Sequence, residues 1–187
     1  MHLHRVVRGE PGDLVLRLEQ RGAEEPEIPV DANRRTLYAA ADLYDSATYD
    51  DSLDARAYRW ARAPRTPEAA LCRALHDHAI DVALEQWIVG RRLVGVMGGH
   101  GLQRGAPAYA EAARLGALLG ESHVVATGGG PGAMEAANLG GYLAGHPEAL
   151  EDALRRLAAT PSYRPSVDAW VRQAFAIRAA HPDGNAS

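Results

Sequence analysis

The sequence predicts an α/β fold in which a parallel sheet is flanked by helices. Two short apolar segments, 93–97 and 122–127, are each followed by a glycine-rich turn and then by a helical pattern. A strand–turn–helix order that occurs twice in succession is typical of parallel β-α units. In such units a ligand binds at the carboxyl ends of the strands. We therefore expect a binding site where the two glycine-rich turns meet.

The composition excludes several classes of function. The chain has 187 residues, enough for one domain, and a formal net charge of −4. This acidic balance argues against a nucleic-acid partner, which requires a basic face. No segment approaches the roughly 20 apolar residues of a transmembrane helix, and the first residues do not resemble a signal peptide. The single cysteine, Cys72, excludes an internal disulfide framework. We expect a cytoplasmic protein without a membrane partner.

Residues 1–65 form an N-terminal extension of uncertain structure. The alternation of apolar residues predicts a short strand at 14–18 and a second one at 28–30 that pairs back onto it. Residues 34–44 fit either a helix or a buried strand, and 50–52 fit a loop. This extension either packs against the rest of the chain or contributes to a dimer contact.

A long helix opens the second part of the chain, residues 66–187. Thr66 is a suitable N-cap and Pro67 suits the first helical position, and the helical pattern continues to Val89. Two apolar stripes indicate a helix that is covered on more than one side. It either covers the sheet or contacts another subunit. We expect no metal site on this helix, because its two histidines are only two residues apart and do not share a face.

The first glycine-rich turn has the sequence Gly-Gly-His at 98–100. A loop joins it to a helix predicted over 107–119, in which Tyr109 is assigned to the core and small residues let the helix lie close to the sheet. His100 and Arg104 belong to the loop above the carboxyl edge of the sheet. Each of them either contacts a phosphate or a base, or stands exposed in the loop.

The second turn has the sequence Thr-Gly-Gly-Gly-Pro-Gly at 127–132. Three consecutive glycines leave no Cβ atoms to block the close approach of backbone N–H groups. Pro131 lacks an N–H and suits the first position of the next helix. The helix N-terminus presents unpaired N–H groups and the positive end of the helix dipole, to which a phosphate is a natural ligand. The alternative is a tight turn with a purely structural role.

Three side chains beside the second turn support a phosphorylated ligand. Thr127 ends its strand and offers a hydroxyl group. Glu135 lies in the first turn of the helix, where it either accepts hydrogen bonds from ribose hydroxyls or only complements the helix dipole. Met134 packs beneath the loop or beside a base.

Two common nucleotide-binding patterns are absent. The second turn lacks the G-x-G-x-x-G spacing of dinucleotide-binding proteins, and no acidic residue ends a following strand to hold a ribose. The P-loop pattern is also absent, and a phosphate-binding lysine is impossible because all 20 basic residues are arginine.

The string TGGGPGAMEAAN, preceded by GGHG, resembles the LOG-like nucleotide-binding superfamily. This group includes the Lonely Guy phosphoribohydrolases, the nucleotide 5′-monophosphate nucleosidases and proteins once named lysine decarboxylases. The likeness covers about 93–145, and the GGH is closest to the nucleosidase branch. It implies a Rossmann-like domain that holds a nucleoside 5′-monophosphate and hydrolyses its N-glycosidic bond, in a homo-oligomer, as a dimer or larger.

The pattern and the resemblance together define the candidate site. The candidate ligand-binding residues are Gly98, Gly99, His100, Arg104, Thr127, Gly128, Gly129, Gly130, Pro131, Gly132, Met134, Glu135 and Asn138. The resemblance assigns a carboxylate to the position of Glu135, which takes a supporting role in catalysis. The catalytic residue itself is not identified. We expect no metal and no cofactor.

The second half of the resembled family's site is missing from the sequence. After Gly145 the chain predicts only helices, beginning near Pro147 and Val167. The first has three leucines on one face, Leu150, Leu154 and Leu157. The second is amphipathic, and its apolar residues are Val167, Trp170, Val171, Ala174, Phe175 and Ile177. The resembled family carries a further PGGxGTxxE motif and a catalytic arginine, and the motif does not occur in these 187 residues. We therefore expect a sheet that is incomplete at the C-terminal end. Either the chain is an amino-terminal fragment, or a second chain supplies the remainder, or the protein binds without catalysis.

Two functions follow from these alternatives. The first is a nucleoside 5′-monophosphate phosphoribohydrolase, or the part of one that holds the phosphate. The second is a non-catalytic module that senses or binds nucleotides through the same glycine turns. A PGGxGTxxE segment in the full-length protein or in a partner chain would favour the enzyme.

Overall fold

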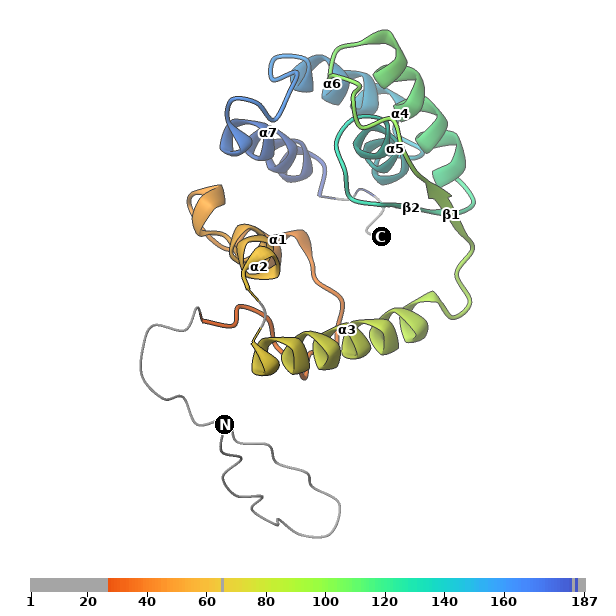
Figure 1. Ribbon diagram of the computed structural model, residues 1–187. Coiled ribbons are helices and arrows are strands. Elements are labelled where there is room, and N and C mark those ends of the chain that lie inside the picture. The colour runs from red at the N-terminus through yellow and green to blue at the C-terminus, as the bar shows by residue number, and fades with distance from the viewer. Residues whose placement is uncertain (1–26, 65, 183, 185–187) are drawn as a thin grey trace.

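The computed structural model describes residues 27–64, 66–182 and 184, and the strand predicted at 14–18 lies outside these ranges. Figure 1 shows the arrangement of its elements. In chain order they are α1 (Ala40–Leu43), the 3-10 helix η1 (Tyr49–Asp51), α2 (Leu53–Arg62), α3 (Pro67–Ile88), β1 (Leu93–Val96), α4 (Pro107–Gly120), β2 (Val124–Thr127), α5 (Ala133–Tyr142), α6 (Pro147–Leu157) and α7 (Val167–Ala180).

The sheet of the described residues consists of β1 and β2, which run parallel. Leu93 pairs with Val124 at one end and Val96 with Thr127 at the other, so both strands end at the same edge. The two predicted strands are confirmed, although each is shorter than expected by one or two residues. The fold is α/β, with a two-stranded parallel sheet flanked by helices.

Helices α4 and α5 pack against each other with almost no side chain between their backbones. Gly116 of α4 lies against the backbone of Ala137, and Gly140 of α5 lies against the backbone of Ala113. A Cβ atom at either glycine would overlap the carbonyl oxygen that faces it. The predicted helix at 107–119 is confirmed as α4, and its small residues bring it close to α5.

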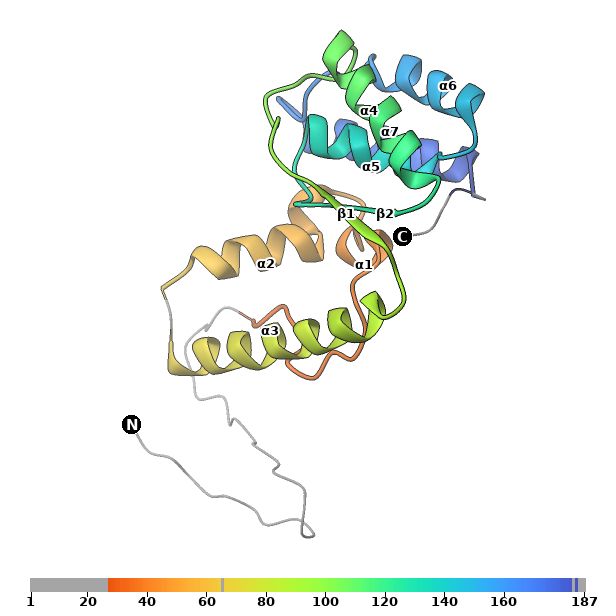
Figure 2. The ribbon, with the colours of Figure 1, turned by 90° about the vertical axis from the view of Figure 1, so that its right-hand side faces the viewer.

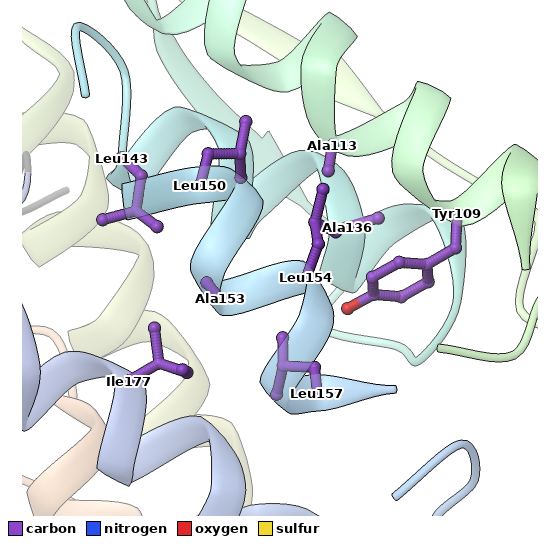
Figure 3. Packing of buried hydrophobic residues seen from close by; sticks show 9 residues of the cluster. All are labelled: Tyr109, Ala113, Ala136, Leu143, Leu150, Ala153, Leu154, Leu157 and Ile177. Atoms are coloured by element: carbon purple, nitrogen blue, oxygen red, sulfur yellow. The ribbon is translucent and has the colours of Figure 1, made fainter. Parts of the chain in front are cut away.

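A hydrophobic core joins α4, α5, α6 and α7 (Figure 3). The core residues are Tyr109, Ala113, Ala136, Leu143, Leu150, Ala153, Leu154, Leu157 and Ile177. The predicted positions of Tyr109 in the core and of three leucines on the inner face of α6 are confirmed. In α7, whose predicted apolar face was broader, Ile177 is the residue that is buried.

The described part of the N-terminal extension contains short helices and no strand. Residues 28–30 form no strand, because Pro29 has no N–H to donate to a sheet. The expected helix or buried strand at 34–44 is reduced to the four residues of α1. The loop expected at 50–52 is η1 followed by Ser52, whose hydroxyl accepts a hydrogen bond from the Ala55 N–H as the N-cap of α2.

Contacts with α7 hold this extension in place. The backbone N–H of Tyr49 donates to Asp168 Oδ1 at 2.5 Å. The ring of Tyr44 meets that of Phe175 edge-on, with the centroids 5.7 Å apart. As a result, α1 and α2 lie between α3 and the group of helices α4 to α7 (Figure 2).

Helix α3 begins and ends close to the predicted positions. The hydroxyl of Thr66 accepts a hydrogen bond from the Ala69 N–H at 3.2 Å, as an N-cap does. Of the two alternatives for α3, a cover over the sheet is not observed, since Figures 1 and 2 place α3 beside α1 and α2, away from α4 and α5. Its exposed large apolar residues are Leu71, Leu75, Val82, Leu84 and Ile88.

In the described ranges, α3 and the other helices all lack the apolar length required to traverse a lipid bilayer.

Candidate functional site

The two glycine-rich turns touch each other at the carboxyl edge of the sheet. The last pair of the ladder, Val96 and Thr127, lies at this edge. The Ala133 N–H donates to the carbonyl oxygen of Gly99 at 3.1 Å, which joins the second turn to the first. The predicted meeting of the two turns is therefore observed.

Glycine is required at the point of contact by both backbone conformation and space. Gly99 and Gly132 have φ angles of 66° and 78°, which L side chains rarely adopt. A Cβ on Gly99 would lie 2.5 Å from the Cβ of Ala133, and one on Gly132 would overlap the Gly99 carbonyl oxygen. Gly129 also has a positive φ, 72°, but faces open space. Larger residues at the first two positions would separate the turns.

The amino end of α5 differs from the prediction. Pro131 is not the first helical residue, because Gly132 follows it with φ 78° and ψ −129°, a conformation that no helix contains. The helix instead begins at Ala133, with Gly132 as N-cap. The N–H groups of Met134 and Glu135 have no hydrogen-bond partner among the described residues, as expected in the first turn of a helix. These two amides are the donors that α5 offers to an anion.

Thr127 and Met134 support the second turn from two sides. The hydroxyl oxygen of Thr127 accepts a hydrogen bond from the Gly129 N–H at 3.2 Å, which closes the turn. Met134 is buried, and a Cβ on Gly130 would overlap its Cε atom. Met134 therefore lies directly under the loop.

Arg104 and Glu135, both predicted to contact a ligand, form an ion pair inside the protein. Arg104 Nε donates to Glu135 Oε1 at 2.8 Å, and Arg104 Nη2 donates to the same oxygen. The Arg104 side chain is 1% exposed and that of Glu135 is 16% exposed. The Arg104 guanidinium lies 4.5 Å from the ring centroid of Trp170, and its Nη1 donates to the Trp170 carbonyl oxygen at 3.1 Å.

Burial determines the electrostatics of this group. Desolvation raises the pKa of Glu135 above its usual value, against the opposing effect of Arg104. Desolvation also raises the pKa of Tyr109, with a smaller contribution of the same sign from Glu135. The hydroxyl group of Tyr109 is buried without a hydrogen-bond partner among the described residues.

The remaining candidates lie at the surface, and one of them is distant. Gly98, His100 and Gly128 are exposed beside the turns. Asn138 is exposed on α5 and lines a cavity of about 500 Å³. The other residues of this cavity lie at the amino end of the strands, as Arg92 does, or at the carboxyl ends of α4 and α5. The structure therefore does not bring Asn138 to the glycine turns.

Sequence reasoning missed the contribution of Trp170. It lies 66 residues from Arg104 and was expected only as part of an apolar helix face. No local pattern reports such a contact. Within the described ranges, no group of three or more histidine, cysteine, aspartate or glutamate side chains is arranged to hold a metal ion.

Comparison of the chain with protein-family models, with curated proteins and with solved structures finds no match. The function must therefore be inferred from the geometry of the site.

Proposed function

We propose that this protein binds a nucleoside 5′-monophosphate at the two glycine turns through a Rossmann-like arrangement. The observation that carries this proposal is the contact between the turns, in which the Ala133 N–H donates to the Gly99 carbonyl oxygen at 3.1 Å. It leaves the next two amides of α5 without partners at the carboxyl edge of a parallel sheet, where α/β proteins bind their ligands.

The phosphate would be bound by backbone groups. The N–H groups of Met134 and Glu135, together with the positive end of the α5 dipole, stabilise an anion without a lysine. Exposed glycines at 128 and 129 allow a phosphate to approach the backbone closely. The Glu135 carboxylate, beside this position, would accept hydrogen bonds from ribose hydroxyls.

The activity we propose is hydrolysis of the N-glycosidic bond, which releases a free base and ribose 5-phosphate. The resemblance of TGGGPGAMEAAN to the LOG-like superfamily supports it. Positive charge develops on the sugar as this bond breaks, and a nearby carboxylate such as Glu135 would stabilise it. The 187 residues hold no PGGxGTxxE motif, so the main acid would come from further sequence or from a second chain.

A second candidate function is nucleotide binding without catalysis. It is favoured by the ion pair between Glu135 and Arg104, which already engages the carboxylate nearest the turns. Both candidates require the same binding site, and they differ in whether the bound nucleotide is hydrolysed.

The test compares two substitutions at one exposed position. Gly129 has a positive φ and open space around a Cβ, and aspartate and asparagine both tolerate this conformation. Gly129→Asp places a negative charge beside the phosphate, whereas Gly129→Asn has the same shape without the charge. Binding of AMP, GMP, CMP and UMP is measured by calorimetry. We expect Gly129→Asp to bind about tenfold more weakly than Gly129→Asn, because like charges at an interface are strongly unfavourable.

The outcomes separate the possibilities. Equal affinities of the two variants, or a wild-type protein that binds none of these nucleotides, would refute the proposed site. Release of ribose 5-phosphate from a bound nucleotide distinguishes the hydrolase from the binding module. The assay is repeated with the full-length reading frame or with any co-purifying chain.

We also propose a cytoplasmic homodimer. The exposed apolar residues of α3 support self-association, because large apolar patches commonly mark interaction surfaces.

A further inference from the structure

We propose that Arg104 is a positioning residue that fixes Glu135 for the ribose diol, so that the site selects ribose over deoxyribose. The inference rests on the proposed function, since it assigns a sugar specificity to the same site. It follows from how Arg104 is held and from which oxygen of Glu135 it engages.

Arg104 engages one carboxylate oxygen and leaves the other. Its Nε and Nη2 atoms both donate to Glu135 Oε1, and Oε2 receives no hydrogen bond from Arg104. Two hydrogen bonds from one guanidinium hold Oε1 in place, so Oε2 is the oxygen that the pair leaves for a ligand. Because the Arg104 side chain is 1% exposed and that of Glu135 is 16% exposed, the accessible part of this pair belongs to Glu135.

Arg104 is held from three other directions. Its guanidinium lies over the indole of Trp170, at 4.5 Å from the ring centroid, and Nη1 donates to the Trp170 carbonyl oxygen. Its backbone N–H donates to the Pro161 carbonyl oxygen at 3.0 Å. A side chain enclosed in this way cannot extend to a phosphate at the α5 N-terminus. Its contribution to the site is therefore the orientation of Glu135.

A fixed carboxylate oxygen discriminates between sugars. A ribose hydroxyl that donates to Glu135 Oε2 forms a charge-assisted hydrogen bond. A deoxyribose lacks that donor and leaves the partly buried carboxylate oxygen without a partner, which is unfavourable. The expected preference for ribose is about tenfold in affinity, which corresponds to a hydrogen bond to a charged group.

The experiment compares sugars with and without the relevant hydroxyl, both in the absence of a base and in nucleotides that share one base. Affinities of the wild-type protein are measured for ribose 5-phosphate and 2-deoxyribose 5-phosphate, and for AMP and its 2′-deoxy and 3′-deoxy analogues. We expect at least one deoxy analogue in the AMP series to bind about tenfold more weakly than AMP. Equal affinities for all three nucleotides would overturn the inference while the proposed function stands. A protein that binds none of the compounds refutes both.

Two arginine variants separate positioning from general stability. Arg104→Lys keeps the charge but loses the planar group that donates twice to Oε1. Its matched control is Arg114→Lys, since Arg114 donates from Nε and Nη2 to the two carboxylate oxygens of Glu151, on the surface between α4 and α6. We expect Arg104→Lys to reduce the ratio of AMP to deoxy-AMP affinity toward one, and Arg114→Lys to leave that ratio unchanged.

A merely structural role for Arg104 gives a different result. In that case Arg104→Lys would weaken AMP and both deoxy analogues by the same factor, which contradicts the inference. If Arg104→Lys does not fold, Trp170→Leu replaces it, because it keeps Arg104 and Glu135 but removes the indole face that holds the guanidinium in place. The same loss of ribose preference is expected, and an unchanged preference in a folded Trp170→Leu protein would count against the inference.

Discussion

Glu135 differs from an exposed glutamate because its carboxyl group is largely buried. Burial raises its pKa, although two Arg104 N–H groups bond to its Oε1 atom. The folded protein therefore retains a proton on Glu135 at pH values at which the unfolded chain has lost it. It follows that the contribution of Glu135 to stability is fully present below its usual pKa of 4.5 and is lost as the pH rises through the higher folded pKa.

This sign predicts how Glu135→Gln behaves. The variant cannot titrate at this position, so the free energy of unfolding of the wild type, relative to the variant, should decrease as the pH rises above 4.5. Urea unfolding of both proteins between about pH 4 and pH 8 measures this difference. A relative stability of the wild type that increases with pH would contradict the raised pKa.

Glu151 provides a control of opposite sign. The hydrogen bond from Arg114 lowers the pKa of Glu151, on the exposed surface. Its contribution is present above its usual pKa and is lost as the pH falls through the lower folded value. Relative to Glu151→Gln, the wild type should therefore become more stable, not less, as the pH rises toward 4.5, and this comparison is extended to pH values below 4.

At the scale of the elements, the contact between α4 and α5 is the most demanding feature of the fold. Gly116 and Gly140 each face a backbone carbonyl of the opposite helix, with no room for a methyl group. The same contact holds α5 in place, and the amino end of α5 forms the second glycine turn. The distance between these helices therefore sets the position of the candidate site.

We predict that Gly116→Ala destabilises the protein by about 1–3 kcal/mol, the usual cost of overpacking. This would occur although alanine is the better helix former by about 1 kcal/mol. The measurement is urea unfolding. Gly101→Ala is the control, because a Cβ there meets no atom within 4 Å, and its stability should change by less than about 0.5 kcal/mol. A Gly116→Ala protein as stable as the wild type would mean that α4 and α5 separate without cost.

The elements of the second part of the chain could be predicted because their signals are local. Thr66-Pro67 and the proline at 107 mark helix starts, and the apolar runs before the glycine turns mark β1 and β2. The contact between the turns followed from the parallel order of the strands. The prediction for 28–30 failed because apolar alternation was read across Pro29, which cannot donate to a sheet.

The composition of the candidate site could be predicted only in part. The backbone donors follow from the glycine pattern, but the partner of Glu135 does not. Arg104 is 31 residues away in sequence, and Trp170 is a further 66 residues from Arg104. Such a contact depends on how α7 packs, which no periodicity within α7 reveals. The sequence therefore identified Arg104 and Glu135 as candidate ligand contacts without any indication that the two pair with each other.

At the scale of the whole molecule, apolar surface remains uncovered in the described residues. The sheet of the described residues is small, with two strands. Parallel sheets normally have both faces covered by helices. Helix α3 leaves Leu71, Leu75 and Val82 at least 37% exposed along one side, and Leu84 and Ile88 add to its exposed apolar surface. The first three residues are spaced by four and seven positions, so they lie on one helix face.

We predict that this face of α3 pairs with the same face of a second copy. Sedimentation velocity at increasing protein concentration should therefore show a dimer. The double variant Leu75→Glu and Val82→Glu should shift the protein toward monomer, because it would place four carboxylates in an apolar contact. Leu118→Glu, at an exposed position of α4, should leave the dimer unchanged. A wild type that stays monomeric would refute the proposed homodimer, and loss of the dimer in Leu118→Glu alone would move the interface from α3 to α4.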